Sequence, residues 1–126
     1  YDIASCLVGS EMCIRDRRKA AEESPCVFVG RCADYVLRDH KNIVTVFITA
    51  DLDDRIANVQ RLNNCSPEEA RKIISNKEES RSSYYNYYTG KTWGSSASYD
   101  LCVNSSRLGL EGTKQFIADF IRKMQK

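Results

Sequence analysis

The feature that most constrains the fold is a β-branched apolar run, from Ile43 to Ala50, that leads directly into a helix-forming segment. Valine, isoleucine and threonine favour extended chain, and an unbroken apolar run predicts a strand buried on both faces. The next segment, 51–62, has acidic residues in its first turn, where the helix dipole favours negative charge. Its apolar residues recur at helical spacing, at Leu52, Ile56, Val59 and Leu62. A buried strand that feeds a helix is typical of a parallel α/β sheet.

The same alternation of strand and helix continues along the chain. Apolar runs at 26–30 and 101–104 predict two further short strands. The sequence Ser66-Pro67-Glu68-Glu69 has the pattern of a capping box with proline at the first helical position, which predicts a helix from there to about Tyr88. An amphipathic helix is predicted over 111–124, with Phe116, Ile117, Phe120, Ile121 and Met124 on one face.

A first helix, RRKAAEE from Arg18, is predicted to end before Pro25, because proline disfavours helical dihedral angles in the residue that precedes it. Strands separated by helices indicate right-handed crossovers. The expected fold class is therefore α/β, a parallel sheet with helices on both faces.

Composition narrows the class of protein. The chain has 126 residues, of which 42% are hydrophobic and 29% charged, as in a single globular domain. Every apolar run falls short of the roughly 20 residues that a membrane-spanning helix needs. Basic residues number 19 and acidic residues 17, a balance that argues against binding nucleic acid through its phosphates. We expect a cytoplasmic protein with a local anion site and with neither membrane nor nucleic acid as partner.

The cysteines suggest neither a metal site nor a disulfide framework. They are six in number and include no C-x-x-C pair, at positions 6, 13, 26, 32, 65 and 102. This pattern favours a reducing cytosol, and Cys26 and Cys102, in apolar strands, are expected to behave as small hydrophobic residues. The single histidine, His40, is expected on the surface.

Residues 6–17, CLVGSEMCIRDR, resemble the in-frame translation of a transposase adapter used to prepare sequencing libraries. On this interpretation residues 1–17 are a non-native segment, and the protein's own sequence is 18–126. The alternative is a natural strand, SCLVG, that enters a short basic helix. An independent assembly of the same gene would distinguish the two.

A candidate anion site follows the strand at 26–30. Ligands of parallel α/β sheets bind at the carboxyl ends of the strands, where this sequence reads Gly30-Arg31-Cys32-Ala33-Asp34. Glycine lets the backbone turn closely, and an arginine presents a planar fork of donors to a phosphate. The alternative is a surface pair between Arg31 and Asp34 or Asp39.

A second constellation lies on the long helix. Positive charge and aromatic rings lie within a few turns of each other, at Lys77, Glu78, Arg81, Tyr84, Tyr85, Tyr87 and Tyr88. Such a helix could clamp a nucleotide phosphate. Two alternatives remain open: a solvated charged face that leads into a tyrosine core, or a stacking surface for the bases of single-stranded RNA.

The sequence Gly90-Lys91-Thr92 resembles the end of a phosphate-binding loop, but it fails the full pattern. The motif G-x-x-x-x-G-K-[ST] requires glycine at position 85, which is Tyr85 here. The segment also follows a helix, whereas the motif follows a strand. We therefore find no phosphate-cradling loop in this sequence.

Three strings resemble, in order and spacing, the cytidylate kinase-like family, a branch of the P-loop nucleoside monophosphate kinases. They are PCVFVGRCADYVLRD, VFITADLDDRI and SRSSYYNYYTGKTWGSSASYDLCVNSSRLGLEG, and the resemblance covers about residues 18–126. It implies a P-loop NTPase type of fold. It also implies transfer of the terminal phosphoryl group of ATP to CMP or dCMP, with Mg²⁺.

The resemblance assigns substrate-binding roles near the first candidate site. Arg31 matches the arginine that holds the pyrimidine monophosphate in cytidylate kinases. Cys32 stands where those enzymes have a base-reading aspartate, and Asp34 is the expected substitute. Glu78 matches an acidic residue, normally aspartate, that faces the acceptor sugar.

The resemblance also assigns a lid, at about 66–98. Arg81 matches a lid arginine that grips the phosphates, which makes it the expected catalytic residue. A further lid arginine would fall at Ile74, so this contact in substrate binding is either missing or supplied elsewhere, by Lys77 or Arg71. Arg55 occupies a position that is often basic in related kinases, where it would bind the cofactor ATP, although a surface ion pair is the competing interpretation.

Relatives begin with a strand, a glycine-rich loop and a helix that have no counterpart here. On the family pattern, 18–126 is the carboxyl-terminal part of the domain, without the first strand and the phosphate-binding loop. That strand would lie between the strands at 27–29 and 44–49, and its loss would expose two apolar edges. The resemblance thus predicts an inactive fragment of a kinase.

Overall fold

The computed structural model describes residues 7–8, 27–28, 37, 39 and 42–124. The chain divides into two units, Tyr1–Ile43 and Val44–Lys126, and we describe each by itself. The predicted helix before Pro25, Cys32 and His40 lie outside the described residues.

The first unit contains a short pair of parallel strands, β1 (Leu7–Val8) and β2 (Val27–Phe28), with Leu7 opposite Val27. Strand β2 confirms part of the strand predicted at 26–30. Strand β1 falls within the segment expected to be non-native. Because a two-residue pairing fits either origin of that segment, the non-native origin stays a prediction.

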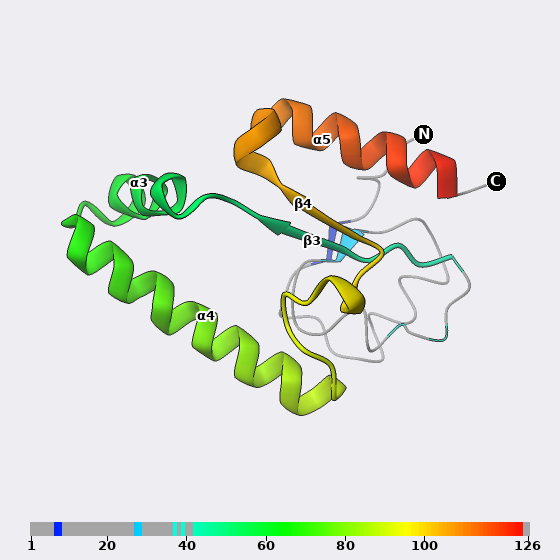
Figure 1. Cartoon of the computed structure of the whole chain (residues 1–126), viewed down its shortest axis with the longest axis horizontal. Helices are drawn as coiled ribbons and strands as arrows, with labels where there is room; N and C mark the ends of the chain where they lie inside the picture. Colours follow the sequence, from blue (N-terminus) through cyan, green and yellow to red (C-terminus); the bar gives the residue numbers. More distant parts are fainter. Residues whose placement is uncertain (1–6, 9–26, 29–36, 38, 40–41, 125–126) are drawn as a thin grey trace. The chain divides into compact units, whose positions relative to one another are not determined.

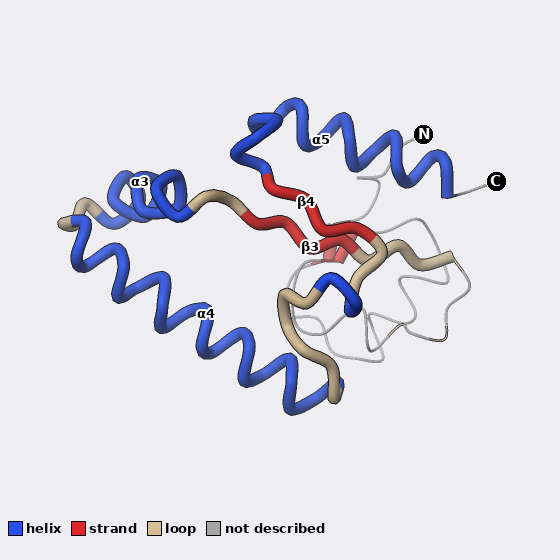
Figure 2. The backbone as a smooth tube through the Cα atoms, in the orientation of Figure 1, coloured by secondary structure: helices blue, strands red, loops and turns tan. Residues whose placement is uncertain are grey.

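The second unit is built on two parallel strands joined by a long crossover (Figure 1). Strand β3 (Val46–Thr49) pairs with β4 (Leu101–Asn104), and Val46 lies opposite Leu101. Between them come α3 (Leu52–Asn63), α4 (Pro67–Thr89) and the short helix η1 (Ser96–Ser98); α5 (Ser105–Met124) follows β4. Figure 2 shows this order by element type. The strand–helix–strand alternation predicted for this part of the chain is confirmed, as a small parallel sheet with helices.

Helices α3 and α4 form a hairpin with its own small core. Ile56, Ala70 and Ile74 are buried, and Val59 and Cys65 pack against them. Two helices that bury one shared stripe stabilise each other, because neither can hide its apolar side chains alone.

The connection in this hairpin is set by local sequence. Asn64 adopts a left-handed conformation (φ 50°) at the end of α3, where its N–H donates to the carbonyl of Gln60 over 2.8 Å. Asparagine is among the few non-glycine residues that tolerate this region. Ser66 then caps α4 by accepting from the backbone N–H of Glu69 over 3.2 Å. The predicted N-cap at Ser66 and the helix that follows it are thus confirmed.

Not every apolar position of α3 is buried as the sequence pattern suggested. Leu62 is 65% exposed and Leu52 is 49% exposed. Leu62 comes six residues after Ile56, which places it about 120° around the helix from the side that faces α4. The spacing of apolar residues predicted the helix correctly but predicted a buried side that is wider than the observed one.

Helix α5 begins earlier than the 111–124 predicted for it. It starts at Ser105 and is broken at Gly109, whose dihedral angles (φ 72°, ψ 173°) are not helical. Such angles suit glycine because it has no Cβ. Its predicted apolar face is only partly buried: Phe116 and Met124 are each 47% exposed. In the described part of the chain α5 packs on two strands, which do not cover that whole face.

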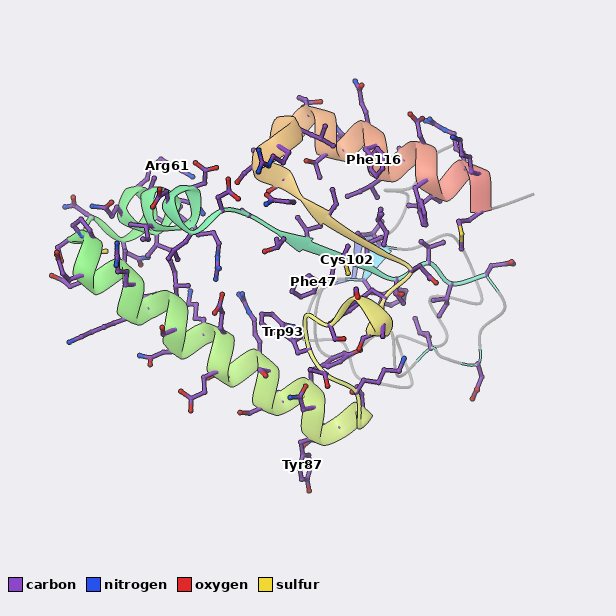
Figure 3. The ribbon with its side chains drawn as sticks, viewed as in Figure 1. Phe47, Arg61, Tyr87, Trp93, Cys102 and Phe116 are labelled. Atoms are coloured by element: carbon purple, nitrogen blue, oxygen red, sulfur yellow. The ribbon has the colours of Figure 1, made fainter. Side chains whose placement is uncertain are left out.

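The opposite face of the strand pair carries an aromatic cluster (Figure 3). The Phe47 ring lies 5.2 Å from that of Trp93, edge-on, and 5.0 Å from that of Tyr99. Tyr99 in turn stacks on Tyr85 of α4, with ring centroids 6.0 Å apart. Helices were expected on both faces of the sheet. Among the described residues, α5 covers one face and this aromatic cluster covers the other. The cluster attaches the end of α4 to the sheet.

Close backbone approach helps to form the cluster. Gly94 has φ 79°, and a Cβ atom there would lie 3.5 Å from the Phe47 ring. Asn86 Oδ1 accepts from the Trp93 backbone N–H over 2.8 Å, which holds the turn after α4. Tyr85, Asn86 and Trp93 thus connect the end of the helix to the sheet.

Two strand residues predicted to be buried are not. Ile48 is 54% exposed, and Cys102, expected as a small hydrophobic residue of the interior, is exposed with a free thiol. In the part of the chain that the structure describes, β3 and β4 form a two-stranded sheet, so less surface covers them than a wider sheet would provide.

Replacing Phe47 with alanine should lower the free energy of unfolding by about 2 kcal/mol, because the ring loses its contacts with Trp93 and Tyr99. Urea unfolding followed by far-UV circular dichroism measures this change. The matched control is Phe116→Ala on the partly exposed face of α5, which should cost less than about 1 kcal/mol. Equal losses in the two variants would contradict a packed aromatic cluster.

Candidate functional site

A polar network joins the carboxyl ends of β3 and β4. Asn104 Nδ2 donates to Asp51 Oδ1 over 2.9 Å, and the Asp51 backbone N–H donates to Ser106 Oγ over 2.9 Å. Ser105 Oγ donates to the carbonyl of Thr49 over 3.1 Å. These bonds fix the first turns of α3 and α5 at one edge of the sheet, the edge where ligands of parallel α/β sheets bind. Sequence reasoning missed this network, although Asp51 and Asn104 each stand directly at a strand end.

An ion pair joins the two helices of the hairpin. Arg55 Nη2 in the first turns of α3 donates to Glu78 Oε1 in the middle of α4. The side chains are 31% and 40% exposed, so solvent screens the pair and its net contribution to stability is about 0–1 kcal/mol. Of the two interpretations of Arg55, the ion pair is the one that the structure contains.

Beyond this ion pair α4 continues without α3 beside it. The two helices contain 23 and 12 residues, which correspond to lengths of about 34 and 18 Å. Because Glu78 lies opposite Arg55, near the start of α3, the residues of α4 after Glu78 extend past the end of the hairpin (Figure 1). This carboxyl-terminal half of α4 carries the expected catalytic residue, Arg81.

Lys77 and Arg81 are exposed and form no hydrogen bond or ion pair within the described residues. They are four residues apart and therefore lie on the same side of α4. Glu78 is engaged with Arg55, so it does not neutralise Arg81 although only three residues separate the two. Both cations are available to an anion.

The tyrosines of α4 divide into two groups. Tyr85 is buried at 6% exposure and packs in the aromatic cluster. Tyr84, Tyr87 and Tyr88 are 40%, 82% and 55% exposed, so the alternative of a tyrosine core is wrong for these three. The reason is geometric, because only the side of the helix that carries Tyr85 faces Tyr99.

The exposed tyrosines contact one another. The ring centroids of Tyr84 and Tyr88 are 4.6 Å apart, and those of Tyr87 and Tyr88 are 4.9 Å apart. Tyr87 points away from the rest of the second unit in Figure 3. An aromatic surface therefore lies one turn beyond the two free cations.

Two predicted site residues, Arg31 and Asp34, lie outside the described residues. Their roles in substrate binding therefore stay predictions. No group of three or more histidine, cysteine, aspartate or glutamate side chains able to hold a metal ion is found among the described residues. In the same residues, no helix has the length and apolar character needed to cross a bilayer.

Comparison with known proteins finds a family model and a solved structure that match this chain. A model of the cytidylate kinase-like family matches residues 13–107. The crystal structure of an uncharacterized protein from Eubacterium ventriosum ATCC 27560 is similar, with a TM-score of 0.80 and 30% sequence identity. The similarity covers 85% of this chain and 60% of that one, so this chain spans about three fifths of the length of that protein. No curated protein matches the chain.

Proposed function

The chain belongs to the cytidylate kinase-like family, and on this premise we propose that it carries part of the machinery of a nucleoside monophosphate kinase. The reaction would be transfer of the terminal phosphoryl group of ATP to CMP or dCMP. The observation that supports this most is the family match over residues 13–107, which includes Arg31, Glu78 and Arg81.

The positive side of α4 suits the chemistry. During phosphoryl transfer negative charge spreads over the moving group, and catalysis depends on positioning and on nearby cations. The Arg81 guanidinium has no partner among the described residues, and it can donate two parallel hydrogen bonds to phosphate oxygens. Lys77 adds a second cation one turn earlier. We assign charge stabilisation to Arg81 and phosphate binding to Lys77.

The acceptor would be held by three further residues. Arg31 would bind its phosphate, Asp34 would contact the base, and Glu78 would accept a hydrogen bond from a sugar hydroxyl. The ion pair with Arg55 is compatible with this role, because a carboxylate accepts several hydrogen bonds and Glu78 Oε2 can bind while Oε1 holds Arg55. Arg55 likewise has further N–H groups for an ATP phosphate.

Magnesium ions in such reactions are bound largely by substrate phosphates and water, with one or two protein carboxylates. The described residues contain no cluster of metal-binding side chains, and the sequence contains no G-x-x-x-x-G-K-[ST] motif. We therefore assign no ligand for Mg²⁺ to this chain and derive no step from the ion.

A second candidate function is supported by the exposed rings of Tyr84, Tyr87 and Tyr88. They would suit a non-catalytic module that binds a nucleotide or single-stranded RNA by stacking. The two functions differ in turnover, since a binding module would form no CDP even in a chain that is extended upstream.

A coupled assay with CMP, ATP and Mg²⁺ tests the proposal. We expect the 126-residue chain to show no turnover above background, because no loop in its sequence cradles the phosphates. The same chain, extended upstream by the strand, glycine-rich loop and helix of a relative, should form CDP. Turnover by the short chain would refute the need for that loop. An extended chain that folds but forms no CDP would refute the kinase.

A further inference from the structure

Four side chains share one side of α4, and two of them are cations while two are aromatic. Lys77, Arg81, Tyr84 and Tyr88 follow one another at spacings of four, three and four residues. At 100° per residue these positions fall within an arc of about 60°. Spacings of three and four bring side chains into a continuous row on a helix surface.

Each member of this row is accessible. The rings of Tyr84 and Tyr88 are 40% and 55% exposed although they contact each other. Their planes are tilted by 46°, so each leaves part of one face open. Neither Lys77 nor Arg81 forms an ion pair in the described part of the chain. The row is therefore a preformed surface with positive charge at one end and aromatic faces at the other.

The dimensions of the row match a small ligand. Tyr84 and Tyr88 lie about 4.5 and 10.5 Å along the helix axis from Arg81. This range is comparable with the separation between the base of a nucleotide and its phosphates. An anion held by Lys77 and Arg81 would thus place an attached planar ring system beside the two tyrosines.

We propose that this face of α4 binds a nucleoside phosphate, with the phosphate on Lys77 and Arg81 and the base stacked on Tyr84 and Tyr88. The inference rests on the proposed function and extends it by naming two residues that stack on a nucleobase, a contact distinct from the one assigned to Asp34. Every base has a π-face, so stacking on these rings supplies affinity without selecting one base.

A mononucleotide fits this surface better than an RNA strand. Binding to a strand depends on a track of cations along its backbone, whereas the row offers two. The net charge of +2 for the whole chain agrees with a ligand that carries only a few phosphates.

The test compares alanine variants of aromatic residues on and off the row in the full chain. Tyr84→Ala and Tyr88→Ala each remove a ring of the row. Phe116→Ala is the matched control, because Phe116 is an aromatic residue of α5 that is 47% exposed and does not belong to the row. Isothermal titration calorimetry gives Kd for ATP, CMP and inorganic tripolyphosphate, and far-UV circular dichroism checks that each variant folds.

We expect Tyr84→Ala and Tyr88→Ala to weaken binding of ATP or CMP about tenfold, as loss of a stacking ring predicts. Binding of tripolyphosphate, which has no base, should change less than twofold in both variants. Phe116→Ala should leave every Kd within twofold, and Tyr84→Phe should retain nucleotide binding because the ring remains. The ATP and CMP arms distinguish a donor site from an acceptor site.

Three results would overturn the proposal. Nucleotide binding that does not change in Tyr84→Ala and Tyr88→Ala would refute the stacking site but leave the proposed kinase intact. A wild-type chain that binds neither nucleotides nor tripolyphosphate would refute the row as a binding site, whereas the kinase is refuted only by an extended chain that folds and forms no CDP. The third result is that a uridine-rich RNA oligonucleotide binds far more tightly than the mononucleotides, and that Tyr84→Ala and Tyr88→Ala abolish this binding. It would identify a single-strand binding surface instead.

Discussion

Arg81→Ala should lower kcat for CDP formation about a thousandfold in the upstream-extended chain of the coupled assay. An arginine that stabilises the charge of a transferring phosphoryl group contributes a factor of about 10³–10⁵ in related reactions. Arg81 is in a position to do so because its guanidinium is exposed and without an acidic partner among the described residues. The coupled assay with CMP and ATP, run at saturating substrate, measures the loss.

Two further variants test whether the loss of kcat comes from the guanidinium of Arg81. Arg61→Ala removes an exposed arginine of α3 that donates to Asn58 Oδ1 over 2.7 Å, and it should leave kcat within twofold. Arg81→Lys should recover only part of the activity, since an ammonium group lacks the planar pair of donors. If Arg81→Ala retained more than a tenth of the wild-type kcat, Arg81 would not be a catalytic residue.

Ile56→Ala should lower the free energy of unfolding by about 3 kcal/mol. The side chain is 7% exposed and packs with Ala70 and Ile74 in the core of the hairpin. Truncating a buried isoleucine removes transfer free energy and leaves a cavity, because the rigid helices relax only partly. Urea unfolding monitored by circular dichroism gives the difference.

Leu62→Ala on the same helix is the matched control for this prediction. Leu62 is 65% exposed, so its loss should change the free energy of unfolding by less than about 0.5 kcal/mol. If Ile56→Ala does not fold, Ile56→Val, with an expected cost of about 1 kcal/mol, provides the same comparison. Similar values for the Leu62 variant and either Ile56 variant would contradict a core between α3 and α4.

Local signals explain which elements could be predicted from the sequence. The capping box at Ser66, the β-branched run before Ala50 and the run at 101–104 each act over a few residues, and all three elements are present. The burial of a side chain depends on which elements pack against it, and the spacing of apolar residues gives no information on these neighbours. Leu62 and Phe116 were therefore placed in apolar stripes that the described neighbours do not cover.

The candidate site could likewise be predicted only where local sequence determines it. Helical spacing alone places Lys77 and Arg81 on one side of α4. The partner of Glu78 could not be predicted, because Arg55 is 23 residues away in sequence and is brought near only by the hairpin. The tyrosines show the same limit: identical residues at adjacent positions have opposite environments, set by whether a position faces Tyr99.

The aromatic cluster also equips the chain with an optical reporter. Trp93 is the single tryptophan, and it lies where α4 is attached to β3 through Phe47 and Tyr99. Indole emission shifts to longer wavelength when water replaces aromatic neighbours, so intrinsic fluorescence monitors this junction without any added dye. Separation of the helical arm from the strands would be recorded as a red shift, whereas unwinding confined to the hairpin tip would leave the spectrum unchanged.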